Sequence, residues 1–206
     1  LIGVNFGSFI KGYDFGEVNY TKMIAGIKDF VNAKGDFRDP EFNSQFKISP
    51  ELINDVFNNH LEKRRNYKLL DNKDKGEKFL AANLKKAGVQ ETESGLQYRI
   101  IEPGDENNKP VATDTVAVRY KGTLIDGTVF DETPEGADPA RFTLNAVVPG
   151  WTEGMQLIGE GGHIELFVPA ELAYGENGRP GIEPNSTLIF DVELEHVGKP
   201  APAAAE

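Results

Sequence analysis

The feature that most constrains the fold is a long stretch without helix breakers, residues 50–87. Ser49 followed by Pro50 is a helix start, with serine as the N-cap and proline at the first helical position. Gly88 is a stop signal, and the next proline after Pro50 is Pro103. At 1.5 Å per residue such a helix is ~57 Å long. This is too long for a compact domain of about 90 residues, so the stretch predicts a linking helix, with Gly76 as a candidate bend.

Two shorter helices are predicted ahead of the linking helix. Apolar residues recur at helical spacing in residues 1–13 and again in residues 19–33, and residues 35–48 are predicted to be an irregular connection. Three helices of this kind cannot bury so much apolar surface alone, because domains this small are already marginal. We therefore expect a second chain to cover them. His60, on the apolar side of the linking helix, is interpreted as an interface or core histidine rather than a metal ligand.

The second half of the chain has a different pattern. Only two prolines precede residue 91 and ten follow it, and the hydrophobic period changes from helical to alternating. Leu96, Tyr98 and Ile100 predict one strand, and Asp126-Gly127 predicts a hairpin turn. Further strands are predicted around residues 116–120, 142–144, 164–168 and 188–194. The fold class is thus α+β: an N-terminal helical part, then an antiparallel sheet with one solvated face, wrapped around a short helix near Trp151.

Charge and composition exclude several functions. The net charge is −11, and residues 91–206 hold 7 Lys and Arg against 21 Asp and Glu. This argues against nucleic acid as a partner, because phosphate binding needs basic clusters. The chain has no cysteine and three well-separated histidines, so neither a metal site nor a cofactor is expected. The lack of cysteine is compatible with an oxidising compartment.

No motif for covalent or phosphate chemistry stands out. There is no phosphate-cradling glycine loop and no G-x-S-x-G. Trp151, the only tryptophan, lies between Gly150 and Gly154. It is either a core residue or the floor of an apolar pocket with a few polar groups. The residues that could converge there are Tyr120, Phe130, Asp131, Val147, Val148, Trp151, Tyr174, Ile182 and Phe190.

Four stretches carry a family resemblance: 118–131 (VRYKGTLIDGTVFD), 147–154 (VVPGWTEG), 173–182 (AYGENGRPGI) and 186–194 (STLIFDVEL). In this order they resemble an FKBP-type peptidyl-prolyl cis–trans isomerase, over nearly all of residues 91–198. The first half resembles the helical dimerisation domain of the Mip-like (macrophage infectivity potentiator) subgroup. The resemblance implies an FKBP-like fold at 91–198, a dimerisation domain with the linking helix at 1–90, and a disordered tail at 199–206.

The resemblance also implies roles for the pocket residues. Trp151 is the floor on which the proline ring rests. Asp131 lies beside the twisting amide, and the Tyr174 hydroxyl and the Val148 N–H donate to substrate carbonyls. Asp131, Tyr174 and Phe130 are the implied catalytic group. The walls are Tyr120, Phe130, Val147, Val148, Ile182 and Phe190.

Two departures from the family pattern affect this transfer. Residues 132–141 are rearranged, so that no basic partner for Asp131 is evident. The aromatic residue that usually precedes the Phe142 strand is replaced by Ala140 or missing.

We therefore expect a homodimeric peptidyl-prolyl isomerase with chaperone activity, acting on unfolded or proline-containing proteins and open to macrolide inhibitors. The subgroup implies export to the periplasm or outer membrane of a bacterium. The alternatives are a non-catalytic chaperone or proline-segment binding module, and a purely structural dimer. Retention of both Asp131 and Tyr174 favours catalysis.

Overall fold

The computed structural model describes residues 2–12, 15–46 and 50–198. The predicted serine N-cap at Ser49 and the predicted disordered tail at 199–206 lie outside the described residues. The chain divides into two compact units, Leu1–Tyr67 and Lys68–Glu206, so that the division falls within the long helix.

The first unit is helical, as predicted. It contains α1 (Ile2–Gly12), α2 (Tyr20–Asn32), the short 3-10 helix η1 (Pro40–Gln45) and the first part of α3 (Pro50–Asn83). Helix α2 begins after Asn19, whose side chain accepts a hydrogen bond from the Lys22 amide at 3.0 Å. Among the apolar side chains described in this unit, Phe42 alone is buried. The predicted excess of uncovered apolar surface is therefore present.

Helix α3 is one continuous helix, but it ends at Asn83 rather than at residue 87. Tighter bonds replace the α-helical ones there: the Lys86 amide bonds to the Asn83 carbonyl, three residues back. Gly76 is no bend, because the helix runs through it. Its role is close approach, since a Cβ at this position would lie 2.4 Å from the Thr187 hydroxyl oxygen.

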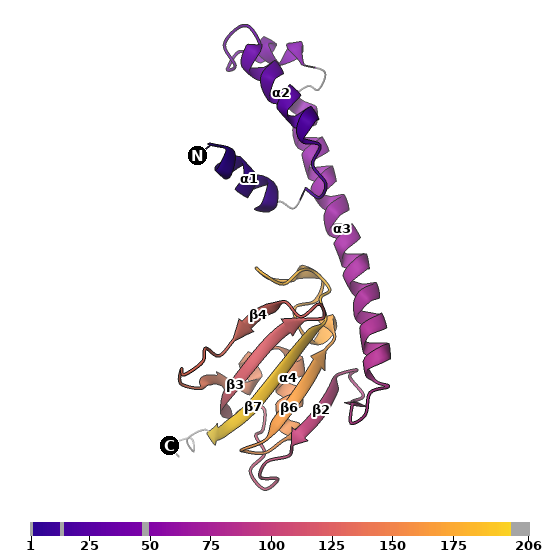
Figure 1. Cartoon of the computed structure of the whole chain (residues 1–206), viewed down its shortest axis with the longest axis vertical. Coiled ribbons are helices and arrows are strands. Elements are labelled where there is room, and N and C mark those ends of the chain that lie inside the picture. The colour runs from indigo at the N-terminus through magenta and orange to yellow at the C-terminus, as the bar shows by residue number, and fades with distance from the viewer. Residues whose placement is uncertain (1, 13–14, 47–49, 199–206) are drawn as a thin grey trace, which may run out of the picture. The chain divides into compact units, whose positions relative to one another are not determined.

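The second unit holds one antiparallel sheet, and Figure 1 shows its strands side by side. Strand order is β1-β2-β6-β7-β3-β4, and β5 pairs with β3 beside β4. The predicted hairpin joins β3 to β4, with Gly127 donating to the Leu124 carbonyl. The strands are β1 (Gln90–Glu91), β2 (Gln97–Glu102), β3 (Thr115–Leu124), β4 (Val129–Glu132), β5 (Ala140–Thr143), β6 (His163–Val168) and β7 (Leu188–Gly198).

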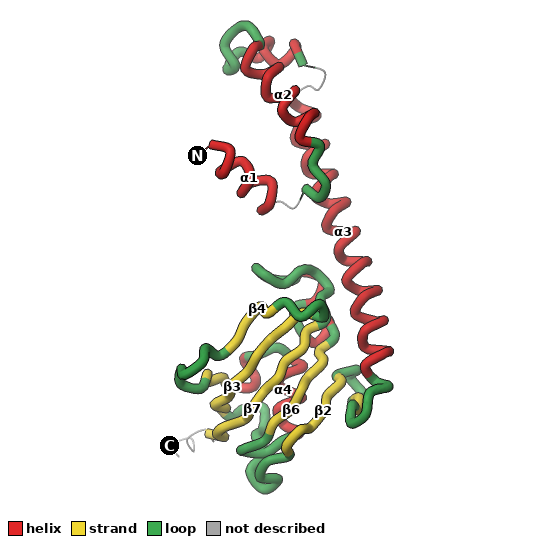
Figure 2. The backbone as a smooth tube through the Cα atoms, in the orientation of Figure 1, coloured by secondary structure: helices red, strands yellow, loops and turns green. Residues whose placement is uncertain are grey.

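Helix α4 (Pro149–Gly154) packs against one face of this sheet, and Figure 2 labels it among the strands. Two glycines allow the close approach. A Cβ at Gly154 would lie 2.4 Å from a methyl of Leu166, and one at Gly150 would lie 2.5 Å from a methyl of Val168. Four short 3-10 helices complete the unit: η2 (Leu144–Ala146), η3 (Met155–Leu157), η4 (Ala170–Leu172) and η5 (Gly175–Asn177). The strand expected at 142–144 ends at Thr143, because Leu144 begins η2.

The C-terminal half of α3 belongs to the second unit and covers part of the other face of the sheet. The rings of Phe79 and Phe167 lie 6.2 Å apart. Gln97, predicted on the solvated face, is buried: its amide donates to the Leu80 carbonyl, and its oxygen accepts from Asn83. Ile100, predicted on the buried face, is exposed. The alternation in β2 mispredicted Gln97 because a pattern local to the strand carries no information about a helix that packs over it.

Candidate active site

Trp151 is the centre of an aromatic box. Its ring is 4% exposed and makes three edge-to-face contacts, at interplanar angles of 80° to 89°. The ring centroids of Tyr120 and Phe190 each lie 5.3 Å from it, and that of Phe142 lies 5.6 Å away. Because edge-to-face packing fixes ring orientation, these three rings hold the indole as a rigid floor.

A cavity of about 370 Å³ lies over this floor. Seven of the nine predicted residues line it, from five parts of the chain: Tyr120 (β3), Asp131 (β4), Val147, Val148, Trp151 (α4), Tyr174 and Phe190 (β7). Three lining residues were missed by the sequence reasoning: Phe142, Ala146 and Arg179.

Two predicted wall residues, Phe130 and Ile182, do not line the cavity. Phe130 packs edge-to-face on the wall residue Phe190, with ring centroids 5.5 Å apart, and Ile182 is buried in the core cluster that includes Phe190. Both are therefore packed with the cavity wall without lining the cavity itself. Ala140 does not line the cavity either; the aromatic ring on that side comes from Phe142, which β5 places beside Tyr120 at 5.9 Å.

The basic partner of Asp131 comes from the opposite loop. An Nη of Arg179 lies 3.6 Å from an Asp131 carboxylate oxygen, close enough for an ion pair. Arg179 follows Tyr174 in a loop far along the chain from Asp131. No local sequence pattern predicts this pair. The family resemblance of residues 173–182 was the one signal that placed the loop near the pocket.

The polar groups at the cavity mouth influence one another. Burial, above all, raises the pKa of Tyr120 to about 12, and a hydrogen bond to Asp131 and its negative charge add to the rise. Arg179 acts in the opposite direction, because a nearby cation favours the tyrosinate. The Tyr120 hydroxyl is therefore a firmly protonated donor to Asp131.

Two N–H groups at the cavity have no partner within the described part of the chain. The Trp151 indole nitrogen is buried without an acceptor. The Val148 amide, which precedes α4, likewise has no acceptor among the described residues. The Val148 amide can therefore donate to an acceptor on a bound chain, whereas the indole N–H is enclosed by protein, where an unpaired donor costs about 1–3 kcal/mol.

Other chemistry finds little support in the described ranges. They contain no cluster of His, Asp and Glu able to hold a metal ion, and no helix with the length and apolarity to cross a membrane. His163 is partly buried, and its Nε2 lies 2.6 Å from an Asp191 oxygen.

Each half of the chain matches a known family model. Residues 106–195 match the family model for FKBP-type peptidyl-prolyl cis–trans isomerase. Residues 1–100 match the model for the domain amino terminal to it.

Relatives match over most of their length. The chain is 40% identical to the FKBP-type peptidyl-prolyl cis–trans isomerase FkpA of Aeromonas hydrophila, over 97% of this chain and 75% of that protein. It is 44% identical to the outer membrane protein MIP of Legionella longbeachae, over 94% of this chain and 85% of that protein. The crystal structure of FkpA from Escherichia coli superposes with a TM-score of 0.81 at 37% identity, covering 98% of this chain and 92% of that one.

Isomerisation of a peptide bond needs neither a metal nor a nucleophile. An aromatic cavity such as the one in the matched region suits this reaction. The chain belongs to the FKBP-type peptidyl-prolyl cis–trans isomerase family and is a peptidyl-prolyl isomerase with the family's amino-terminal domain.

Proposed function

We propose that X-Pro bonds rotate in the cavity over Trp151. The observation that carries this proposal is an apolar cavity whose floor is an indole clamped by the edges of three other rings. About 370 Å³ lies within the range of small-molecule sites, ~300–1,000 Å³, and admits a proline ring with part of its neighbours.

The residue types suit the reaction. Rotation about a peptide bond crosses a barrier of ~18–20 kcal/mol, because the planar amide loses its resonance. The twisted amide is less polar than the planar one, so a dry aromatic cavity favours the twisted form. No bond is broken, and the work is therefore binding and orientation.

Each polar group has a role in this scheme. Trp151 supports the proline ring. The Val148 N–H and the Tyr174 hydroxyl donate to substrate carbonyls, and Asp131 lies beside the twisting amide, held by Tyr120 and Arg179. Phe130 and Ile182 act indirectly, by fixing Phe190 and the loop that carries Tyr174.

Asp131→Ala tests this assignment. We expect kcat/KM for a prolyl tetrapeptide to fall about tenfold, equivalent to ~1.4 kcal/mol of transition-state stabilisation, with the unfolding midpoint unchanged. Asp138→Ala, an exposed carboxylate in the loop that follows β4, is the matched control and retains full activity. Wild-type rates in Asp131→Ala and in Tyr174→Phe would remove both residues from the site. Tight peptide binding with no acceleration in the wild type would instead favour the proline-segment binding module.

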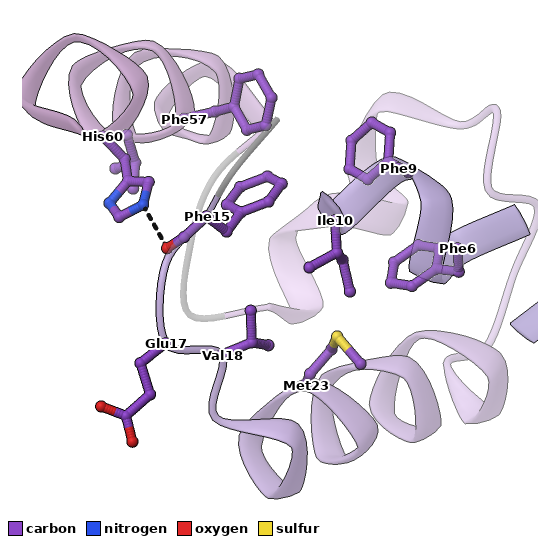
Figure 3. A pocket seen from close by; sticks show the side chains of 10 residues that line it. Phe6, Phe9, Ile10, Phe15, Glu17, Val18, Met23, Phe57 and His60 are labelled. Carbon is purple, nitrogen blue, oxygen red and sulfur yellow. Dashed lines mark hydrogen bonds between the residues drawn. The ribbon is translucent and has the colours of Figure 1, made fainter. Parts of the chain in front are cut away.

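We further propose that residues 1–90 form a homodimer and residues 91–198 the isomerase part. Helix α2 buries none of its residues, and large apolar side chains such as Tyr20, Ile24 and Phe30 are exposed. Figure 3 shows an open apolar pocket of about 480 Å³ in the first unit, with Phe6, Phe9 and Ile10 facing Met23 and Phe57. His60 closes one end by stacking on Phe15 at 5.9 Å and bonding to its carbonyl, in keeping with an interface role. A second copy of the chain covers these exposed apolar side chains with its own.

The dimer suits a folding helper. Two isomerase cavities presented together hold an unfolded, proline-containing client more firmly than one. We propose chaperone activity on such clients, export to the periplasm or outer membrane in line with the name of the Legionella relative, and binding of macrolide inhibitors over Trp151.

A further inference from the structure

The backbone at Arg179 is fixed in a tight turn. The Ile182 amide donates to the Arg179 carbonyl at 2.8 Å, and the Arg179 amide donates to the Ile182 carbonyl at 2.9 Å. Pro180 and Gly181 occupy the second and third positions, and Gly181 has φ +84°. This is the pattern of a type II turn, which needs a left-handed residue at its third position. Because the Ile182 side chain is buried in the core, the turn anchors Arg179 at the cavity mouth.

The Arg179 guanidinium lies between the two sides of that mouth. Its Cζ is 4.7 Å from the centroid of the Tyr174 ring and 6.0 Å from that of Phe130. Stacking on Tyr174 holds the guanidinium plane in place. The side chain is 38% exposed, so that a bound chain can reach it.

The guanidinium keeps its donors available. The 3.6 Å separation from Asp131 is longer than a hydrogen bond, and within the described residues the Arg179 side chain donates none. A half-exposed ion pair of this kind contributes little to stability, so structure alone gives weak reason for an arginine here. What the position does provide is a planar fork with five N–H donors, the geometry that pairs with carboxylates.

The charge stands out against its surroundings. Residues 91–206 carry 21 acidic against 7 basic side chains, and Arg179 is the only cation among the residues lining the cavity. The net negative charge of residues 91–206 repels an acidic client, and within the cavity lining Arg179 is the group that attracts one.

We propose that Arg179 is a specificity-determining residue of the isomerase, receiving an acidic side chain that stands next to the substrate proline. The inference rests on the proposed location of proline over Trp151, because the guanidinium lines the same cavity.

Paired tetrapeptides that differ only in Glu or Gln test the proposal, with the variable residue placed directly before or directly after proline. For the wild type we expect kcat/KM to favour Glu over Gln about two- to fivefold at one of the two positions, the effect of a partly exposed ion pair. The preference falls toward one as ionic strength rises to 1 M, where screening acts within ~3 Å.

Three variants separate charge from structure. Arg179→Lys retains the preference for Glu over Gln, Arg179→Gln abolishes it, and Arg179→Glu reverses it. The preference is the ratio of kcat/KM for two peptides in the same variant, so a modest change in that variant's overall rate does not affect it. Arg119→Glu is the matched control. It makes the same change of charge in the unit, but Arg119 pairs with Glu195 and alternates with Tyr120 on β3, so it faces away from the cavity. It leaves the preference unchanged.

Binding gives a readout independent of turnover, because Trp151, the only tryptophan, reports a bound peptide by its fluorescence. A protein that binds the Glu peptide more tightly but isomerises neither peptide contradicts the proposed function and supports the inference. Equal affinity and equal kcat/KM for Glu and Gln in the wild type, or a preference that survives in Arg179→Gln, overturns the inference and leaves the proposed function intact. Loss of activity toward every peptide in Arg179→Gln also overturns it, because Arg179 would then act in general positioning.

Discussion

Helix α4, which carries Trp151, packs closely on the sheet because residue 154 is a glycine. Gly154→Ala tests this directly. The added methyl would lie 2.4 Å and 2.8 Å from the two methyl carbons of Leu166. Carbon atoms in contact prefer ~3.5–4.0 Å, so the overlap exceeds 1 Å. Gly154 and Leu166 are both buried, which leaves α4 no free space to move into except away from the sheet.

Two opposing effects set the magnitude. Alanine in place of glycine favours the helix by about 1 kcal/mol, and overpacking a filled core costs about 1–3 kcal/mol. The steric effect wins, because both methyls of Leu166 are contacted at once and this side chain is fully buried, with no solvent to rotate into. Because the overlap is large, we expect the upper part of the resulting range, so that Gly154→Ala lowers the free energy of unfolding by up to about 2 kcal/mol. It also displaces Trp151, three residues earlier on the same helix, and so lowers kcat/KM.

The assay is denaturant unfolding followed by Trp151 fluorescence, with prolyl-peptide kinetics on the same samples. Leu166→Val removes part of the obstacle. Made alone, it costs stability but leaves the floor in place and activity largely intact. In the double variant the two losses are less than additive, by about 0.5–1 kcal/mol, because the shorter side chain admits the new methyl. Wild-type stability and activity in Gly154→Ala would refute the close seating of α4 on β6.

Two further predictions concern the rim and the first unit. Tyr120 retains its proton up to about pH 12, Asp131→Asn lowers that pKa, and ultraviolet titration of the two proteins measures the change. Because the folded pKa lies above the ordinary value of 10, the stability linked to Tyr120 is fully present below about pH 10 and is lost as pH rises toward 12; an unchanged titration in the variant contradicts the Tyr120–Asp131 contact. Phe9→Asp places a charge on the apolar pocket of the first unit, and we expect light scattering to show that it converts the dimer to a monomer. Tetrapeptide isomerisation stays intact in this variant. A wild type that is monomeric at micromolar concentration contradicts the proposed interface.

Sequence reasoning reached the helices and strands because their signals are local. The Asp126-Gly127 turn, the spacing of apolar residues in α2 and the long run without proline in α3 each specify an element without reference to the rest of the chain. Seven of the cavity residues were found through motifs. A motif identifies a region of the chain and not the direction of each side chain, so it does not separate Phe130 and Ile182 from the residues that line the cavity.

The features that escaped prediction depend on contacts between distant segments. Arg179 reaches Asp131 across the cavity, and Gln97 is buried because Asn83 and Leu80 lie over it. Alternation marks Gln97 as solvated, and nothing local to β2 says otherwise. Similarly, Gly76 resembles a helix defect until Thr187 is seen opposite it.

The attachment of the last turns of α3 changes where this protein can be cut. A fragment that starts at the first strand would strip Phe79 from Phe167 and leave Gln97 without the Leu80 carbonyl. It would also remove Asn72, which donates to the Pro184 carbonyl near the loop that presents Tyr174 and Arg179. The smallest catalytic fragment that folds by itself therefore begins before Lys68. It retains a part of the helix that, by sequence alone, resembles a linker that could be removed.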